Sequence, residues 1–132
     1  MKRSELREHV FKLLFRIDFY PPELLPEQVP LYLELEEGAL SEEDALAIGA
    51  RFHAVYARIG EIDALINEKT SGWTTERMGK AELAILRLAA FEILFDDDVP
   101  DAVAINEAVE LAKRYGQDAS GSFINGVLAK FV

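Results

Sequence analysis

The feature that most constrains the fold of this chain is the segment from Lys80 to Phe95, KAELAILRLAAFEILF, which is apolar at twelve of its sixteen positions. After the first residue, charge enters only at Glu82, Arg87 and Glu92, which lie five residues apart. In an α-helix this spacing rotates each charge by about 140° from the one before, so the charges share no face. A helix with apolar surface on every side belongs at the centre of a domain. The segment predicts a central helix; an ordinary amphipathic helix with its mildest residues partly exposed is the alternative.

The composition indicates a single domain. With 132 residues, half of them hydrophobic, the chain is long enough to bury a core without disulfides or metal. It has no cysteine, which excludes disulfides and cysteine-based zinc or redox sites. The opening MKRSELREHVFK has no apolar run of signal-peptide length, and the central segment is too short and too charged to span a membrane. We expect one domain over residues 1–132, located in the cytoplasm, with no membrane partner.

Charge is distributed unevenly along the chain. The formal net charge is −10, which argues against a nucleic-acid partner because phosphate neutralisation requires a basic surface. Residues 1–16, however, hold five Lys or Arg against two Glu, and residues 17–50 hold neither Lys nor Arg. This asymmetry is consistent with a basic end that contacts an anion, held on an acidic body that suppresses binding elsewhere. On charge alone, an acidic protein whose N-terminus happens to be basic is the simpler interpretation.

Helical signals run through the whole chain, and no strand pattern or internal repeat interrupts them. Prolines, glycines and capping residues divide it into seven expected helices, over residues 4–20, after Pro26, over 41–59, 62–69, 80–95 and 102–115, and from Ser120 or Ser122 onward. Ser41 is expected to cap the third of these and Gly60 to end it, and Gly116 is expected to end the sixth. Pro30 is tolerated in the second of these only if it falls in the first turn. The fold class is therefore all-α.

The first helix carries two apolar stripes. One is the expected core face, and the other places Phe11, Phe15 and Phe19 every four residues on the far side, with Arg7 and Lys12 near its edges. Aromatic rings beside basic side chains suit single-stranded RNA, because bases stack on rings while cations hold phosphates. Two apolar stripes also describe a helix sandwiched between neighbours, and this helix alone favours that interpretation.

Catalytic motifs are lacking. The two histidines form no HExxH motif, and the glycines match neither GxxxxGK[ST] nor GxGxxG. Around Ser120 the order Asp-Ala-Ser-Gly-Ser lacks the glycine that a nucleophile elbow needs two residues before the serine. We expect a binding protein with no catalytic residue, metal or cofactor.

Three ordered strings carry a resemblance to a known family. They are ILRLAAFEI (Ile85–Ile93), VPDAVAINEAVELAKRYG (Val99–Gly116) and SFINGVLAK (Ser122–Lys130), and LREHVFKLLF stands where the family has its basic first helix. Together they closely resemble NusB, the bacterial transcription antitermination factors. The C-terminal part is specific, whereas residues 21–60 match only as generic helix. The resemblance implies a single helical domain of about seven helices in two packed bundles.

The resemblance also implies partners and site residues. Family members bind the boxA element of ribosomal RNA leaders, pair with NusE, the small-subunit ribosomal protein that doubles as a transcription factor, and help RNA polymerase pass terminators in rRNA operons. The implied RNA surface consists of Lys2, Arg3, Arg7, Lys12, Arg77, Lys80, Gln117, Ser120 and Phe123. The implied NusE side includes Phe15 and Glu82.

Departures from the family keep other functions open. The first helix is diluted by Glu5 and Glu8 and has fewer arginines than the family leads us to expect, so we expect weak RNA affinity without NusE. A helical protein-protein adaptor that has lost RNA contacts is the alternative favoured by the net charge. A domain preceding the catalytic part of an rRNA cytosine methyltransferase is disfavoured, because the chain has no cofactor-binding glycine loop or catalytic cysteine. A steep salt dependence would separate RNA binding from the adaptor.

Several motif residues have a structural interpretation. Asn106, Glu107 and Asn125 can cap or bond neighbouring backbone, and Asn125 followed by glycine inside a helix suggests close packing. Arg87 would need a carboxylate if buried, and Glu107 or Glu110 is the expected partner.

Two further expectations concern single side chains. Trp73 is expected to pack against the central helix from the preceding loop. If Arg7 contacts RNA, Arg7→Glu is expected to lower RNA binding and leave the melting temperature near wild type.

Overall fold

The computed structural model describes residues 1–35, 40–70 and 72–132, and the described residues form helices, turns and loops with no strand. The elements are α1 (Arg3–Phe15), the short 3-10 turns η1 (Arg16–Asp18) and η2 (Pro22–Leu24), α2 (Leu25–Leu35), α3 (Glu42–Ala57), α4 (Ile59–Lys69), α5 (Lys80–Phe95), α6 (Asp101–Tyr115) and α7 (Ser120–Ala129). The predicted all-α fold is confirmed.

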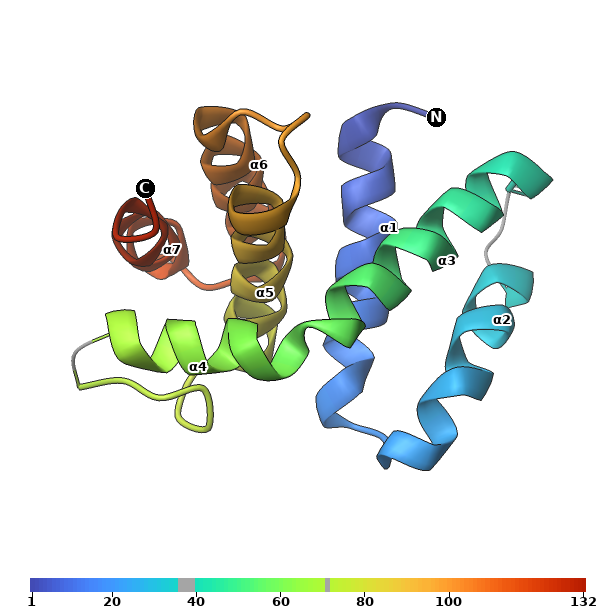
Figure 1. Ribbon diagram of the computed structural model, residues 1–132, viewed down its shortest axis with the longest axis horizontal. Helices are drawn as coiled ribbons and strands as arrows, with labels where there is room; N and C mark the ends of the chain where they lie inside the picture. Colours follow the sequence, from blue (N-terminus) through green and yellow to red (C-terminus); the bar gives the residue numbers. More distant parts are fainter. Residues whose placement is uncertain (36–39, 71) are drawn as a thin grey trace.

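Helix α5 occupies the centre. It packs against α1, α3, α4, α6 and α7, and Figure 1 shows it standing between α1 on one side and α6 and α7 on the other. Every residue from Leu83 to Phe91, and Glu92 after them, is buried. The sequence of this stretch has no polar face because no side of the helix faces solvent. The predicted central helix is therefore confirmed.

The N-terminal bundle contains α1, α2 and α3. Val10, Leu13 and Leu14 of α1 are buried, and α1 packs against both other helices of the bundle as well as α5. Helix α3 begins at a side-chain cap, because Ser41 Oγ accepts a hydrogen bond of 3.0 Å from the Asp44 N–H. That start was predicted from the sequence.

The C-terminal bundle contains α4 to α7, with α5 as its core. Ala104, Ala108 and Ala112 give α6 a buried face of small side chains, which permits close approach to α5 and α7. Gly116 ends α6 as predicted. Among the described residues, no helix is long and apolar enough to cross a membrane.

Three helix boundaries differ from the sequence-based expectations. Helix α1 gives way to η1 after Phe15 instead of running to Tyr20. Gly60 does not terminate α3; the break falls at Arg58, and α4 starts directly after it. Pro30 lies inside α2, beyond the first turn. The expectation for Pro30 was wrong because the proline is exposed, so the carbonyl group left without its helical hydrogen bond can face solvent.

Candidate nucleic-acid interface

The cations of this acidic chain fall into two sets. Six of its fourteen Lys and Arg residues form ion pairs with carboxylates, namely Arg7, Arg51, Arg58, Arg87, Lys113 and Arg114. The other eight form no ion pair within the described part of the chain, and they are Lys2, Arg3, Lys12, Arg16, Lys69, Arg77, Lys80 and Lys130. This second set is available to neutralise an external anion.

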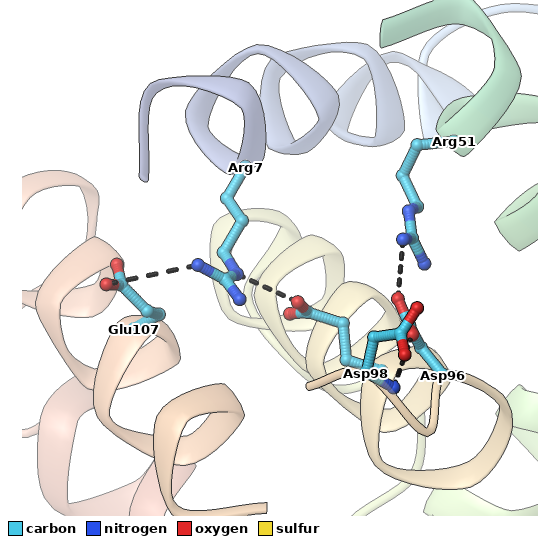
Figure 2. A network of polar contacts seen from close by, with 6 residues as sticks. Arg7, Arg51, Asp96, Asp98 and Glu107 are labelled. Carbon is cyan, nitrogen blue, oxygen red and sulfur yellow. Dashed lines mark hydrogen bonds and ion pairs between the residues drawn. The ribbon is translucent and has the colours of Figure 1, made fainter. Parts of the chain in front are cut away.

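Arg7 belongs to the paired set. Its side chain is 8% exposed and its Nε donates a 2.8 Å hydrogen bond to Oε2 of Glu92, which is 4% exposed. Glu107 lies 4.0 Å from the same guanidinium, so Arg7 joins α1 to α5 and α6 (Figure 2). Burial raises the pKa of Glu92, and Arg7 opposes that rise. Arg7 was expected on the RNA surface, but the structure buries it in an ion pair, so Arg7→Glu is expected to lower the melting temperature as well.

A second ion pair closes the C-terminal end of α5. Arg51 of α3 donates a 2.6 Å hydrogen bond to Asp96 Oδ2, while the Asp98 N–H donates to Asp96 Oδ1 (Figure 2). Burial works to raise the pKa of Asp96, but the hydrogen bonds from Arg51 and Asp98 outweigh it and hold the pKa below its usual value. Arg3 also acts on Asp96 through its charge, which locates Arg3 near this end of α5.

Arg87 is buried and paired, but with other partners than expected. Its guanidinium donates to both carboxylate oxygens of Asp63, at 2.9 and 2.8 Å, and to Asp18 Oδ2 at 3.0 Å. The prediction of Glu107 or Glu110 was wrong, because Arg87 faces α4 and η1 and not α6. Burial works to lower the pKa of Arg87, but the contacts with Asp63 and Asp18 raise it overall.

The aromatic stripe of α1 changes from buried to exposed along its length. Phe11 is buried against Tyr115, whose ring centroid lies 4.9 Å away. Phe15 is half-buried, and Phe19, whose tilted ring lies 4.9 Å from that of Phe15 between centroids, is 57% exposed. The sandwiched interpretation is therefore correct at Phe11 and not at Phe19.

Phe15 faces a largely apolar hollow of about 360 Å³. The hollow lies between α1, α2, the first turn of α5 and the end of α6, and is lined by Phe11, Lys12, Phe15, Arg16, Tyr32, Ala81 and Tyr115. Lys12 and Arg16, which form no ion pair with any described residue, therefore stand beside the half-buried ring of Phe15. This is the face on which the resemblance implies NusE.

Glu82, assigned to the NusE side, lies next to Ser120, which was assigned to the RNA surface. Ser120 Oγ donates a 2.9 Å hydrogen bond to Glu82 Oε1 and accepts one of 2.8 Å from the Gln117 N–H. Ser120 is buried, so it fixes the start of α7 to α5 and is not exposed to RNA as implied. Gln117 and Arg77 are exposed, and Phe123 is half-buried.

The predicted RNA cations lie in separate places, and Lys12 lines the hollow in front of Phe15. Lys2 and Arg3 are exposed at the N-terminal end of α1, beside the C-terminal end of α5. Arg77 and Lys80 lie at the opposite, N-terminal end of α5. A sixteen-residue helix is about 24 Å long, so these cations do not form one compact pocket.

Trp73 was expected to pack against α5, and the ring contact that the structure shows is with α7. Its ring meets Phe123 of α7 edge to face at 5.7 Å, and 48% of the residue stays exposed. The sequence analysis predicted neither this contact nor that of Tyr115 with Phe11. The one sequence signal for Trp73 was a single tryptophan in a loop that contains glycine.

The asparagines of the motif strings are more exposed than expected. Asn106 and Asn125 are exposed and line a hollow of about 630 Å³ between α6 and α7. A Cβ added at Gly126 meets nothing within 4 Å, so the prediction of close packing there was wrong. Glu107 is near Arg7 as described above, in agreement with its structural interpretation.

Within the described ranges, no group of three or more His, Cys, Asp or Glu residues could hold a metal ion.

Comparisons with known proteins agree with the fold. A family model described as NusB family matches residues 4–132. The chain is 53% identical over 131 residues to the transcription antitermination protein NusB of Agathobacter rectalis, covering 99% of both. It is 50% identical over 132 residues to the protein of the same description from Lachnoclostridium phytofermentans, covering 100% of this chain and 99% of the relative.

Solved structures give the same result. NusB of T. maritima superposes with a TM-score of 0.83 at 32% identity, covering 99% of this chain and 90% of that one. A second structure, described as antitermination factors NusB and NusE in complex with dsRNA, gives a TM-score of 0.78 at 26% identity, covering 98% and 94%.

The all-α fold and the similarity to NusB proteins over nearly the whole chain place this protein in the transcription antitermination class. More specifically, the chain belongs to the NusB family.

Proposed function

We propose that this protein binds boxA-type RNA of rRNA leader transcripts together with NusE, and so promotes rRNA transcription within the RNA polymerase antitermination complex. Membership of the NusB family supports the proposal, as does the related structure that contains NusB, NusE and RNA. The fold is retained over nearly the full length of that relative.

The single observation that carries the RNA part is the set of eight cations that form no ion pair among the described residues. In a chain of net charge −10, carboxylates are in excess, so cations that no described carboxylate pairs with are available to phosphates. Lys2 and Arg3 lie at the start of α1, and Arg77 and Lys80 lie by the start of α5. The acidic remainder of the surface disfavours RNA elsewhere.

Arg7 and Ser120 take supporting roles in this proposal. Arg7 holds α1 against α5 through Glu92, and Ser120 ties the start of α7 to Glu82. Both orient neighbouring residues that are exposed, including Arg3 and Gln117. Phe123, half-buried, supplies a ring for base stacking.

The NusE part is supported by the hollow in front of Phe15. The half-buried Phe15 and the exposed Tyr115, with Lys12 and Arg16 beside them, suit a partner that presents an apolar side chain next to carboxylates. Glu82 is half-buried one residue after Ala81, which lines this hollow.

The test is fluorescence anisotropy of labelled boxA RNA and a scrambled RNA, titrated with the protein alone and with NusE at two salt concentrations. We expect selective, salt-sensitive binding that tightens with NusE. The double variant Lys2→Gln/Arg3→Gln is expected to reduce the slope of log K against log salt by up to about 1.4, since each phosphate contact on a single strand contributes about 0.7. Removing these charges leaves the start of α1 intact, because cations there oppose the helix dipole.

Arg58→Gln is the matched control. Arg58 already pairs with Glu61 at 2.9 Å and lies at the α3–α4 junction, so its loss should leave the salt slope unchanged. If no selective RNA binding appears even with NusE, the net charge favours the second candidate, a protein-protein adaptor, and a NusE pull-down without RNA would then be positive.

A further inference from the structure

Trp73 lies exposed between α4 and α5, with hydrogen-bonded residues on either side of it. Thr70 is buried, and its Oγ1 lies 2.9 Å from the Trp73 carbonyl oxygen. Asn67 Oδ1 accepts a 2.7 Å hydrogen bond from the Thr75 N–H, and Gly72 turns the chain with a φ of 79°. The backbone on both sides of the indole is therefore anchored, while about half of the residue faces solvent.

Trp73 and Phe123 both line two neighbouring hollows. The first, about 260 Å³, is also lined by Met78, Gly79, Glu82, Gln117, Ala119 and Ser120. The second, about 270 Å³, is also lined by Thr70, Ser122, Gly126, Val127 and Lys130. This aromatic pair therefore offers ring surface to both hollows.

Three cations lie around Trp73 and Phe123. The Arg77 guanidinium carbon lies 5.9 Å from the Trp73 ring centroid, and Lys130 lines the second hollow. Lys69 lies over Phe131, with its Nζ 5.6 Å from that ring. All three belong to the set without ion pairs in the described residues.

We infer that Trp73 and Phe123 form a stacking platform for single-stranded RNA, with bases entering the two hollows and phosphates held by Arg77 and Lys130. This inference rests on the proposed RNA-binding function and extends it from the start of α7 onto the α4–α5 loop. Exposed ring surface beside unneutralised cations is the combination that non-helical nucleic acid requires. An apolar peptide would use the rings but leave the cations without a function.

Trp73 is the only tryptophan of the chain, so its fluorescence reports on the platform directly. Wild-type protein with NusE is titrated with boxA-type RNA, and tryptophan emission is recorded together with anisotropy of the labelled RNA. NusE is prepared without tryptophan, and absorption by the RNA is corrected with free N-acetyltryptophanamide. We expect quenching that saturates at the same RNA concentration as the anisotropy signal.

Substitutions measure the contribution of each part. Trp73→Ala is expected to weaken RNA binding about fivefold to 150-fold, the equivalent of about 1–3 kcal/mol for one stacked base, while Trp73→Phe retains most of the affinity. Lys130→Gln should lower the salt slope by about 0.7. Gly126→Leu fills the second hollow, where an added Cβ meets no atom, and should also weaken binding.

Ala129→Leu is the matched control for Gly126→Leu, because Ala129 is exposed on α7 and lines neither hollow. RNA binding with unchanged tryptophan emission and unchanged affinity of Trp73→Ala would overturn the inference and leave the proposed function standing. Quenching by NusE alone, with Trp73→Ala weakening only NusE binding, would reassign the loop to the protein partner and also overturn it. Absence of RNA binding by the wild-type complex would overturn both.

Discussion

Replacing Arg7 by Met tests whether the core of this protein depends on a buried charge pair. The substitution keeps an unbranched side chain along α1 but removes the guanidinium, which leaves the Glu92 carboxylate, 4% exposed, without the 2.8 Å hydrogen bond from Arg7. Breaking a buried pair by removing one partner costs about 3–5 kcal/mol, a large part of the 5–15 kcal/mol that typically stabilises a domain. For a chain of this length, that loss lowers the melting temperature by about 10–20 °C.

The assay is thermal unfolding followed by circular dichroism at 222 nm. Arg58→Met is the control, because the Arg58–Glu61 pair is 48% and 52% exposed and is expected to contribute less than about 1 kcal/mol. The double variant Arg7→Met/Glu92→Leu should recover most of the loss, since an apolar pair of similar volume can replace a buried ion pair.

Acidity provides a further check on the same variant. Burial already raises the pKa of Glu92 in the folded state, and loss of Arg7 should raise it more. A carboxyl whose pKa is higher in the folded than in the unfolded state stabilises the fold when it is protonated. The loss of stability in Arg7→Met relative to wild type should therefore shrink as pH falls from 7 toward the usual pKa of a glutamate. A melting temperature of Arg7→Met within about 3 °C of wild type at pH 7, equivalent to a loss of less than about 1 kcal/mol, would refute the reasoning.

Three other predictions concern stability. Asp96→Asn should destabilise the protein at neutral pH and make little difference at strongly acid pH. Arg51 helps to hold the pKa of Asp96 low, and the stability that this lowered pKa provides is lost as pH falls through it. Urea unfolding at both pH values measures the free-energy difference between variant and wild type. Gly126→Ala should raise the stability by up to about 1 kcal/mol, since the added Cβ meets no atom; a lower melting temperature would contradict the open space described there. Gly116→Ala should lower the free energy of unfolding in urea by about 1–3 kcal/mol, because the added Cβ would lie 2.6 Å from the Ser120 side chain. Wild-type stability of this variant would mean that the turn before α7 moves to accommodate the Cβ.

The sequence predicted those features that depend on local periodicity. Helix α5 was recognisable because its charges are spread around the helix, and the cap at Ser41 because capping chemistry lies within three residues. Pairing of buried charges was not recognisable in the same way. Arg87 binds Asp63 and Asp18, which are 24 and 69 residues away, and only the packing of α4 and η1 on α5 decides which carboxylates reach it.

The candidate site shows the same division. The basic character of α1 is visible in the sequence, but spacing alone could not show that Arg7 faces inward while Lys2 and Arg3 remain exposed. Likewise, the sequence offers Trp73 and Phe123 as separate aromatic residues fifty positions apart. Their contact exists because α7 returns to lie beside the α4–α5 loop.

The long-range pairing of α1 with α5 has a consequence for synthesis on the ribosome. Arg7 and Glu92 are separated by 85 residues, so α1 cannot complete its contacts until α5 has emerged. At about 5–20 residues per second, that interval lasts about 4–17 s. Throughout it, the apolar side of α1 has only α2 and α3 to cover it. The surface of α1 that α5 covers in the folded protein is therefore exposed on the incomplete chain during this interval.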